Sequence, residues 1–329
     1  MRKITLFAGQ WIDLKLEDFL HISESIGFDG VDLVFRPNML DLDRLLSDEY
    51  YCEEKKLLLQ KHNLTLNSVS AAYIGKCVGD IYDIRHNALV PNRYQNKPEE
   101  IRKWAAEEML KAPEVAKKLG CHIVHSFLGS PVWNMFYAYP KRPEELVEEG
   151  FEQIAQRWLP ILDEFERQGV YLAFEVHPTE IAYDYYTLQK LLKVLKYHSM
   201  FRLNYDPSHF IWQGMDPVMF LKDFAERIIN VHIKDVKMQL DGRSSVLCSH
   251  LPFGDGRRGW NFRTPGHGDV PFEEIIRELN QNGYKGALTI EWEDNGMCRD
   301  IGVKEAFEYV KKLNFPVSEI EFDAVNRYG

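Results

Sequence analysis

Paired cysteines are missing from this sequence. The five cysteines are scattered along the chain and never form a C-x-x-C pair; they are Cys52, Cys77, Cys121, Cys248 and Cys298. An odd number of widely spaced cysteines argues against a disulfide framework and against a thiolate zinc site. We therefore expect five free thiols.

Long apolar runs and an excess of basic charge are also missing. No stretch approaches the ~18 apolar residues of a membrane span, so we expect no membrane partner. The formal net charge is −10. Nucleic-acid-binding proteins normally carry a basic surface, so we expect no nucleic-acid partner. The first residues enter a strand-like pattern without the apolar stretch of a signal peptide, which predicts a cytoplasmic location.

What the sequence does contain is an alternation of strand and helix patterns. Eight stretches have strand character: 3–8, 30–36, 65–72, 122–128, 171–177, 201–206, 228–234 and 287–293. Helical patterns lie between them at 16–26, 98–119, 144–168, 179–197, 216–227 and 271–282, and Pro113 should kink or divide the second of these. Such an α/β alternation predicts a closed parallel barrel or a doubly wound open sheet.

The turn after the first strand favours the barrel. An open sheet usually has a glycine-rich phosphate turn there, but residues 8–13 read Ala-Gly-Gln-Trp-Ile-Asp and contain no G-x-G-x-x-G. A (β/α)8 barrel instead gathers polar groups from many strand ends at one mouth. We therefore predict a single (β/α)8 TIM barrel over residues 1–313, followed by a C-terminal extension over residues 314–329.

Four consecutive strands end in ionisable side chains, namely Glu175, Asp206, His232 and Glu291. Any one of them alone would more often be a salt-bridge partner, a helix cap or a core histidine. Together they place three carboxylates around one barrel mouth, where mutual repulsion at low effective dielectric calls for a cation. Oxygen and imidazole donors without thiolate suit a divalent ion, with Mn²⁺ as the leading candidate and Mg²⁺, Co²⁺ or Zn²⁺ as alternatives.

Three further polar residues lie on or beside the same strands. His177 shares a strand face with Glu175, because side chains alternate along a strand. Lys234 shares a face with His232, and it either holds a substrate oxygen or acts as a structural counter-charge. His125 either lines the site or points outward to a helix.

Two long connections follow the third and seventh strands, at residues 73–97 and 236–270. Both belong at the catalytic mouth, and long structureless loops in a compact domain are usually lids or binding loops. The second contains Arg263 and His267 and ends in Pro265-Gly-His-Gly-Asp269.

Several of these stretches carry a family resemblance that covers nearly the whole chain. They are Glu175-Val-His-Pro178, Asp206-Pro-Ser-His209, Val231-His-Ile-Lys-Asp235, Pro265-Gly-His-Gly268 and residues 283–291. The chain resembles the xylose isomerase-like TIM-barrel superfamily, the sugar phosphate isomerase/epimerase group. The resemblance implies a metal on Glu175, Asp206, His232 and Glu291, and proton exchange with a sugar by the two glutamates. It also implies substrate contacts for His209 and Arg263.

Differences from some members of that superfamily argue against a DNA-repair function and favour a sugar substrate. Endonuclease IV needs an Asp-x-His pair before the Gly-x-Gly turn, where this chain has Trp260-Asn-Phe262. His177 and the long second loop resemble a larger subset that includes the metal-dependent subunit of C-glycoside deglycosidases. In that subset a histidine two residues after the metal glutamate looks like the catalytic base.

The resemblance therefore implies a divalent-metal-dependent isomerase or epimerase. It would act on a monosaccharide or keto-sugar by removing a proton next to a carbonyl, through an enediolate. One alternative is a metal-dependent lyase that eliminates an aglycone or water from a 3-keto-sugar, and another is a non-catalytic sugar-binding barrel. The partner is a small sugar, with a homo-oligomer or an accessory subunit as a further possibility. The expected substrate contacts are His209, Lys234, Arg263, His125 and His267.

Overall fold

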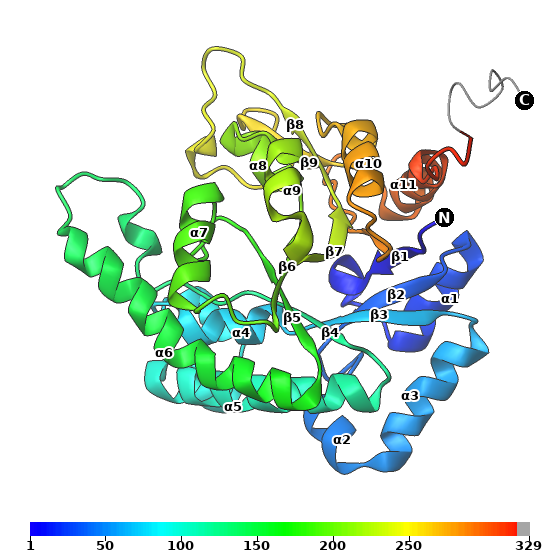
Figure 1. The fold of residues 1–329 in the computed structure, drawn as a ribbon, viewed down its shortest axis with the longest axis horizontal. Helices are drawn as coiled ribbons and strands as arrows, with labels where there is room; N and C mark the ends of the chain where they lie inside the picture. The colour runs from blue at the N-terminus through cyan, green and yellow to red at the C-terminus, as the bar shows by residue number, and fades with distance from the viewer. Residues whose placement is uncertain (321–329) are drawn as a thin grey trace, which may run out of the picture.

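Eight parallel strands close into a barrel in the computed structural model, which describes residues 1–320 (Figure 1). The order around the barrel is β1-β10-β7-β6-β5-β4-β3-β2. The strands are β1 (Ile4–Phe7), β2 (Gly30–Val34), β3 (Thr65–Ser70), β4 (Ile123–Ser126), β5 (Tyr171–Glu175), β6 (Phe201–Tyr205), β7 (Ile228–Ile233) and β10 (Leu288–Ile290). The prediction of a (β/α)8 barrel is confirmed.

Helices surround the barrel and bury their apolar faces against it (Figure 1). They are α1 (Leu16–Ile26), α2 (Leu42–Ser47), α3 (Glu49–Lys61), α4 (Ala72–Gly79), α5 (Pro98–Lys118), α6 (Glu144–Gln168), α7 (Tyr185–Val194), α8 (Ser208–Gln213), α9 (Pro217–Phe224), α10 (Phe272–Gln281) and α11 (Arg299–Leu313). At the end of α1, Gly27 has φ +106°, a left-handed conformation that glycine adopts without steric cost.

Two of the predicted helices differ in detail from the structure. Helix α7 begins at Tyr185 rather than at 179, because Asp184 caps it through a reciprocal capping box with Thr187. The residues before this cap form a turn that belongs to the barrel mouth. Pro113 does not divide α5, which continues through it to Lys118.

Polar side chains fill part of the barrel interior. Asp32 accepts hydrogen bonds from Thr5 Oγ1 (2.7 Å) and Asn67 Nδ2 (2.8 Å). Asn67 also donates to Asn230 Oδ1 (3.0 Å), and Asn230 donates to Asn204 Oδ1 (3.0 Å). Because these buried groups satisfy one another, they cross-link the strands without leaving polar atoms unpaired. The barrel therefore has a fixed, hydrogen-bonded floor.

The long connections after β3 and β7 are more ordered than the predicted structureless loops. The first contains α4. The second contains an antiparallel pair, β8 (Asp235–Met238) and β9 (Trp260–Arg263), and only Lys234 separates β8 from β7. The Asp235 carboxylate accepts backbone N–H groups of Gly266 (2.9 Å), Gly268 (2.8 Å) and Val270 (3.2 Å). This carboxylate fixes the return of the second connection to the barrel.

The last described helix, α11, ends at Leu313. Of the extension expected at 314–329, residues 321–329 lie outside the described part, so its division from the barrel stays a prediction. Within residues 1–320, no helix is both long enough and apolar enough to cross a bilayer. All five cysteines are free thiols, as expected from their spacing.

Candidate active site

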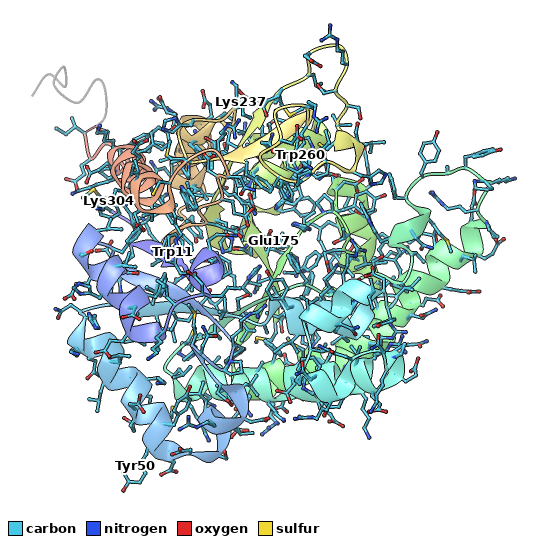
Figure 2. All side chains as sticks on the ribbon, turned by 180° about the vertical axis from the view of Figure 1, so that it is seen from behind. Trp11, Tyr50, Glu175, Lys237, Trp260 and Lys304 are labelled. Atoms are coloured by element: carbon cyan, nitrogen blue, oxygen red, sulfur yellow. The ribbon has the colours of Figure 1, made fainter. Side chains whose placement is uncertain are left out.

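A cavity of about 250 Å³ opens at the carboxyl ends of the barrel strands. Among the residues singled out from the sequence, it is lined by His125, Glu175, His177, Lys234 and Glu291. Figure 2 shows Glu175 near the centre of the molecule, far from the peripheral Tyr50. The barrel thus brings side chains from β4, β5, β7 and the segment after β10 to one place, as strand ends in this fold do.

Glu175, at the end of β5, is held from three sides. It accepts hydrogen bonds from His125 Nε2 (3.0 Å) and Asn204 Nδ2 (2.7 Å), and His209 Nε2 lies 3.5 Å from its other oxygen. Burial alone would raise the pKa of Glu175, but the imidazoles of His125 and His209 hold it well below its usual range. Glu175 is therefore a fixed, ionised carboxylate.

His232 and Glu291 form the next pair, with Lys234 beside them. His232 Nδ1 lies 2.7 Å from Glu291 Oε2 and 3.7 Å from Glu175 Oε2. Burial lowers the pKa of His232, but the charges of Glu291 and Glu175 outweigh burial and raise it to about 9. Lys234 Nζ lies 3.5 Å from Glu291 and 3.2 Å from Glu293. The site therefore collects acidic groups and balances them with cationic neighbours.

Asp206, after β6, completes the acidic group. Its Oδ2 atom lies 3.2 Å from His209 Nε2 and 3.8 Å from Lys234 Nζ. Burial would raise the pKa of Asp206, but these two cationic neighbours lower it. Burial likewise lowers the pKa of His209, while the charge of Asp206 raises it to about 9.

His177 differs electrostatically from its neighbours. Its ring packs edge-on against His209 (centroids 4.1 Å apart) and at a tilt against Phe127 (5.0 Å), and its Nδ1 hydrogen-bonds the carbonyl oxygen of Pro178. Burial and the positive charge of His209 hold the pKa of His177 well below its ordinary value. This imidazole is therefore neutral at neutral pH and faces the cavity.

Two residues expected to contact substrate lie away from both the cavity lining and the group around Glu175. His267 is exposed and pairs with Glu305 on α11 (3.0 Å), because the Gly266–Gly268 turn directs it outward. Arg263 lies 3.6 Å from Asp294 and donates to the Phe262 carbonyl oxygen. The structure therefore does not bring His267 or Arg263 into the group around Glu175.

Other lining residues were not assigned a role from the sequence. Glu293 bonds Lys234 and accepts from Gln10 Nε2 (2.9 Å). Its position two residues after Glu291, on the same strand face, is a signal that could have identified it. Asn204 does not line the cavity, but it lies two residues before Asp206 on β6 and donates to Glu175 (2.7 Å). Tyr73 lines the cavity because it lies just after the end of β3, at the start of the first long connection, which was predicted to lie at the mouth.

The buried donor atoms fit a divalent metal ion. One donor atom each from Glu175, His232 and Glu291 lies within 4.8 Å of the others. His232 Nε2 is buried beside this group and has no hydrogen-bond partner among the described residues. The buried Asp206 Oδ2 makes ion pairs with His209 and Lys234 but no hydrogen bond within the same part of the chain. Unpaired buried polar atoms are costly, and a shared cation would satisfy them. Carboxylate oxygens and imidazole nitrogens are ligands of Mn²⁺, Zn²⁺ and related ions.

Curated proteins are similar to this chain over nearly all of its length or over part of it. The uncharacterized protein YfiH of Bacillus subtilis (strain 168) is 26% identical over 320 residues, covering 91% of this chain and 95% of that protein. The inosose dehydratase of Clostridium beijerinckii is 24% identical over 198 residues, which covers 60% of this chain and 61% of the enzyme. The second match therefore spans less than two thirds of that relative.

Solved structures share the fold at low sequence identity. The 3-keto-D-glucoside 4-epimerase YcjR from E. coli superposes with a TM-score of 0.66 at 15% identity, covering 95% of this chain and 100% of that chain. The IolI protein with a bound zinc atom superposes with a TM-score of 0.65 at 17% identity, covering 95% and 98%. At such identities the likeness establishes the fold alone.

The family model described as "Xylose isomerase-like TIM barrel" matches residues 20–313. That range includes seven of the eight barrel strands and every polar strand end described above. The chain belongs to the xylose isomerase-like TIM barrel family.

Proposed function

We propose that this protein is a divalent-metal-dependent enzyme that isomerises or epimerises a monosaccharide or keto-sugar. The observation that carries the proposal is the pair of glutamates, Glu175 and Glu291, which flank His232 and line the same cavity. A sugar-binding module has no need of two carboxylates at hydrogen-bonding distance from histidines in its cavity. The names of relatives and fold neighbours, which include a dehydratase and an epimerase, support a sugar-modifying enzyme.

The proposed metal ligands are Glu175, Asp206, His232 and Glu291. A divalent ion held by them, Mn²⁺ being our first choice, would supply Lewis-acid stabilisation of the negative charge that develops on the substrate oxygens. Lys234, with its ammonium buried among carboxylates, would bind a substrate hydroxyl or carbonyl oxygen. His125 fixes the orientation of Glu175 by donating a hydrogen bond from Nε2. The other ring nitrogen of His125, Nδ1, lies 3.0 Å from Ser70 Oγ, which holds the imidazole in place.

Proton removal is assigned to the groups that can accept a proton within the cavity. Glu175 and Glu291 are both held ionised by cationic neighbours. Two carboxylates on opposite sides of a bound sugar would allow a proton to leave one face and return to the other, as epimerisation requires. A positioned base of this kind contributes about 10²–10⁴-fold to the rate.

A specific observation favours elimination as a second candidate. His177 is a neutral imidazole that lines the cavity next to Glu175, and Pro178 restricts its backbone. A neutral imidazole can remove a proton next to a carbonyl, and a protonated neighbour can assist the leaving group. Inosose dehydratase relatives carry out an elimination by name. In that case the protein would be a lyase that releases water or an aglycone from a keto-sugar.

One experiment separates these readings. Metal-loaded protein is incubated in D₂O with a panel of free, phosphorylated and oxidised sugars, and products are followed by NMR and mass spectrometry. Deuterium at the carbon next to the carbonyl with the substrate mass otherwise unchanged supports isomerisation or epimerisation. Loss of water or aglycone supports the lyase. Sugar binding without any deuterium exchange, at an affinity that Glu291→Gln leaves unchanged, would support the non-catalytic barrel and overturn the proposal.

A further inference from the structure

A second group of metal-binding side chains lies outside the barrel, between helices α1 and α3. His21 and Glu24 stand one turn apart on α1, and His62 follows the last residue of α3. One donor atom from each lies within 4.8 Å of the other two. We propose that His21, Glu24 and His62 form a binding site for Zn²⁺ or a similar divalent transition-metal ion that joins the two helices.

His62 is the fixed member of this group. Its side chain is only 8% exposed, and its Nδ1 lies 2.8 Å from Glu24 Oε2. Its other ring nitrogen, Nε2, is buried and has no hydrogen-bond partner within residues 1–320. An ion held by His62 and Glu24 would bind Nδ1, the ring nitrogen that faces the carboxylate, and the imidazole proton would then be on Nε2.

The geometry needs a small adjustment, and the exposed members can make it. Bonds of ~2.0–2.1 Å in a tetrahedral zinc site place neighbouring ligand atoms roughly 3.3 Å apart. His62 and Glu24 are already closer than that, at 2.8 Å. His21 has to approach, and it is an exposed side chain whose ring centroid lies 6.3 Å from that of His62. A rotation of His21 therefore closes the tripod, and the remaining position stays open to water.

The local field also favours a cation. Helix α1 ends at Ile26 and α3 ends at Lys61, so Glu24 and His62 lie at the carboxyl ends of two helices. Partial negative charge collects at such ends because the last carbonyl groups lack helical partners. The nearby Lys61 is occupied by Glu17, at 2.8 Å. Lys61 therefore does not neutralise Glu24, whose carboxylate faces His62.

Zinc binding to stripped, untagged protein tests the proposal. Equilibrium dialysis at micromolar Zn²⁺ with metal analysis should give one more ion per chain for the wild type than for His21→Ala. Because the ion joins two helices in the folded state only, a Zn²⁺ excess should raise the unfolding midpoint of the wild type. That rise should shrink in His21→Ala, whose exposed substitution leaves the fold intact.

His267→Ala is the matched control, because His267 is also an exposed histidine paired with a glutamate but belongs to no group of three metal-binding side chains within residues 1–320. It should bind as many ions as the wild type. Glu291→Gln in the barrel should leave the His21-dependent ion in place, so failure of the barrel site and failure of this site give different results. Equal zinc content in His21→Ala and the wild type would overturn the proposal. So would a His21-dependent ion that binds the wild type only with a millimolar dissociation constant.

Discussion

Replacing Glu180 by glutamine tests how the turn that carries His177 is held. The Glu180 side chain is completely buried. It accepts hydrogen bonds from Lys76 Nζ (2.7 Å) and from the backbone N–H groups of Leu128 (3.0 Å) and Gly129 (2.5 Å). The Glu180 backbone N–H donates to the carbonyl oxygen of His177 (3.0 Å). One carboxylate therefore ties the turn after β5 to α4 and to the segment after β4.

The expected cost follows from the chemistry of the amide. Glutamine keeps the shape of Glu180, but its NH₂ group must face either the Lys76 ammonium or the backbone N–H groups. Because the NH₂ group is itself a hydrogen-bond donor, the donors on that side lose their acceptor. Hydrogen bonds to a charged group contribute about 1.5–3 kcal/mol, and removing one member of a buried ion pair costs about 3–5 kcal/mol. Lys76 keeps Asp80 at 3.1 Å and is 19% exposed. We therefore expect a loss of about 2–4 kcal/mol in the free energy of unfolding, below the full buried-pair cost.

Urea denaturation followed by circular dichroism measures this loss. Glu305→Gln is the control, because Glu305 pairs with His267 at the surface and exposed pairs contribute about 0–1 kcal/mol. A destabilisation of Glu180→Gln below about 1 kcal/mol, or one equal to that of the control, would refute the reasoning that this carboxylate holds the turn.

Three further predictions concern the site, the first long connection and the packing of α11. If the reaction is an elimination with His177 as the base, His177→Asn should lower kcat by about 10²–10⁴-fold with metal content unchanged. If Glu175 and Glu291 alone exchange the proton, the same change should mainly raise KM, and a steady-state turnover within a factor of two of wild type would contradict a role of His177 as base. Asp80 raises the pKa of His86. The stabilising effect of His86 relative to His86→Gln should therefore be full below pH ~6.5 and disappear as the pH rises through the folded-state pKa, as read from urea midpoints at several pH values. Gly302→Ala puts a methyl group against the Trp292 indole nitrogen and should cost about 1–3 kcal/mol of stability, whereas an unchanged urea midpoint would show that α11 shifts freely.

The barrel and most of its polar mouth could be predicted because both follow from local patterns. Strand alternation alone places His232 and Lys234 on one face, and the structure has both buried at the mouth. The same alternation left the direction of His125 open. His125 lines the cavity because its Nε2 donates a hydrogen bond to Glu175, on the neighbouring strand β5. Contacts of that kind join residues far apart in the sequence, so a single strand does not reveal them.

The second long connection shows where sequence reasoning failed. Trp260, Asn261 and Phe262 belong to a strand whose partner, β8, precedes it by more than twenty residues, so no short hairpin turn announced the pairing. His267 was expected to contact substrate, and the structure places it outside the cavity lining. Its direction depends on the Asp235 carboxylate, which holds the glycine N–H groups on either side. That constraint is tertiary and leaves no local signature.

Because Lys234 alone separates β7 from β8, changes in chain length should be tolerated very unevenly along this segment. One residue added at Lys234 would reverse the alternation of side chains and turn β8 over relative to His232. The β8–β9 pairing, from Asp235 with Arg263 to Met238 with Trp260, separates this sensitive junction from the tip at 239–259. Insertions and deletions in the tip would leave the ladder register intact. Variation in length there would change the second long connection without moving the strand ends that carry the site.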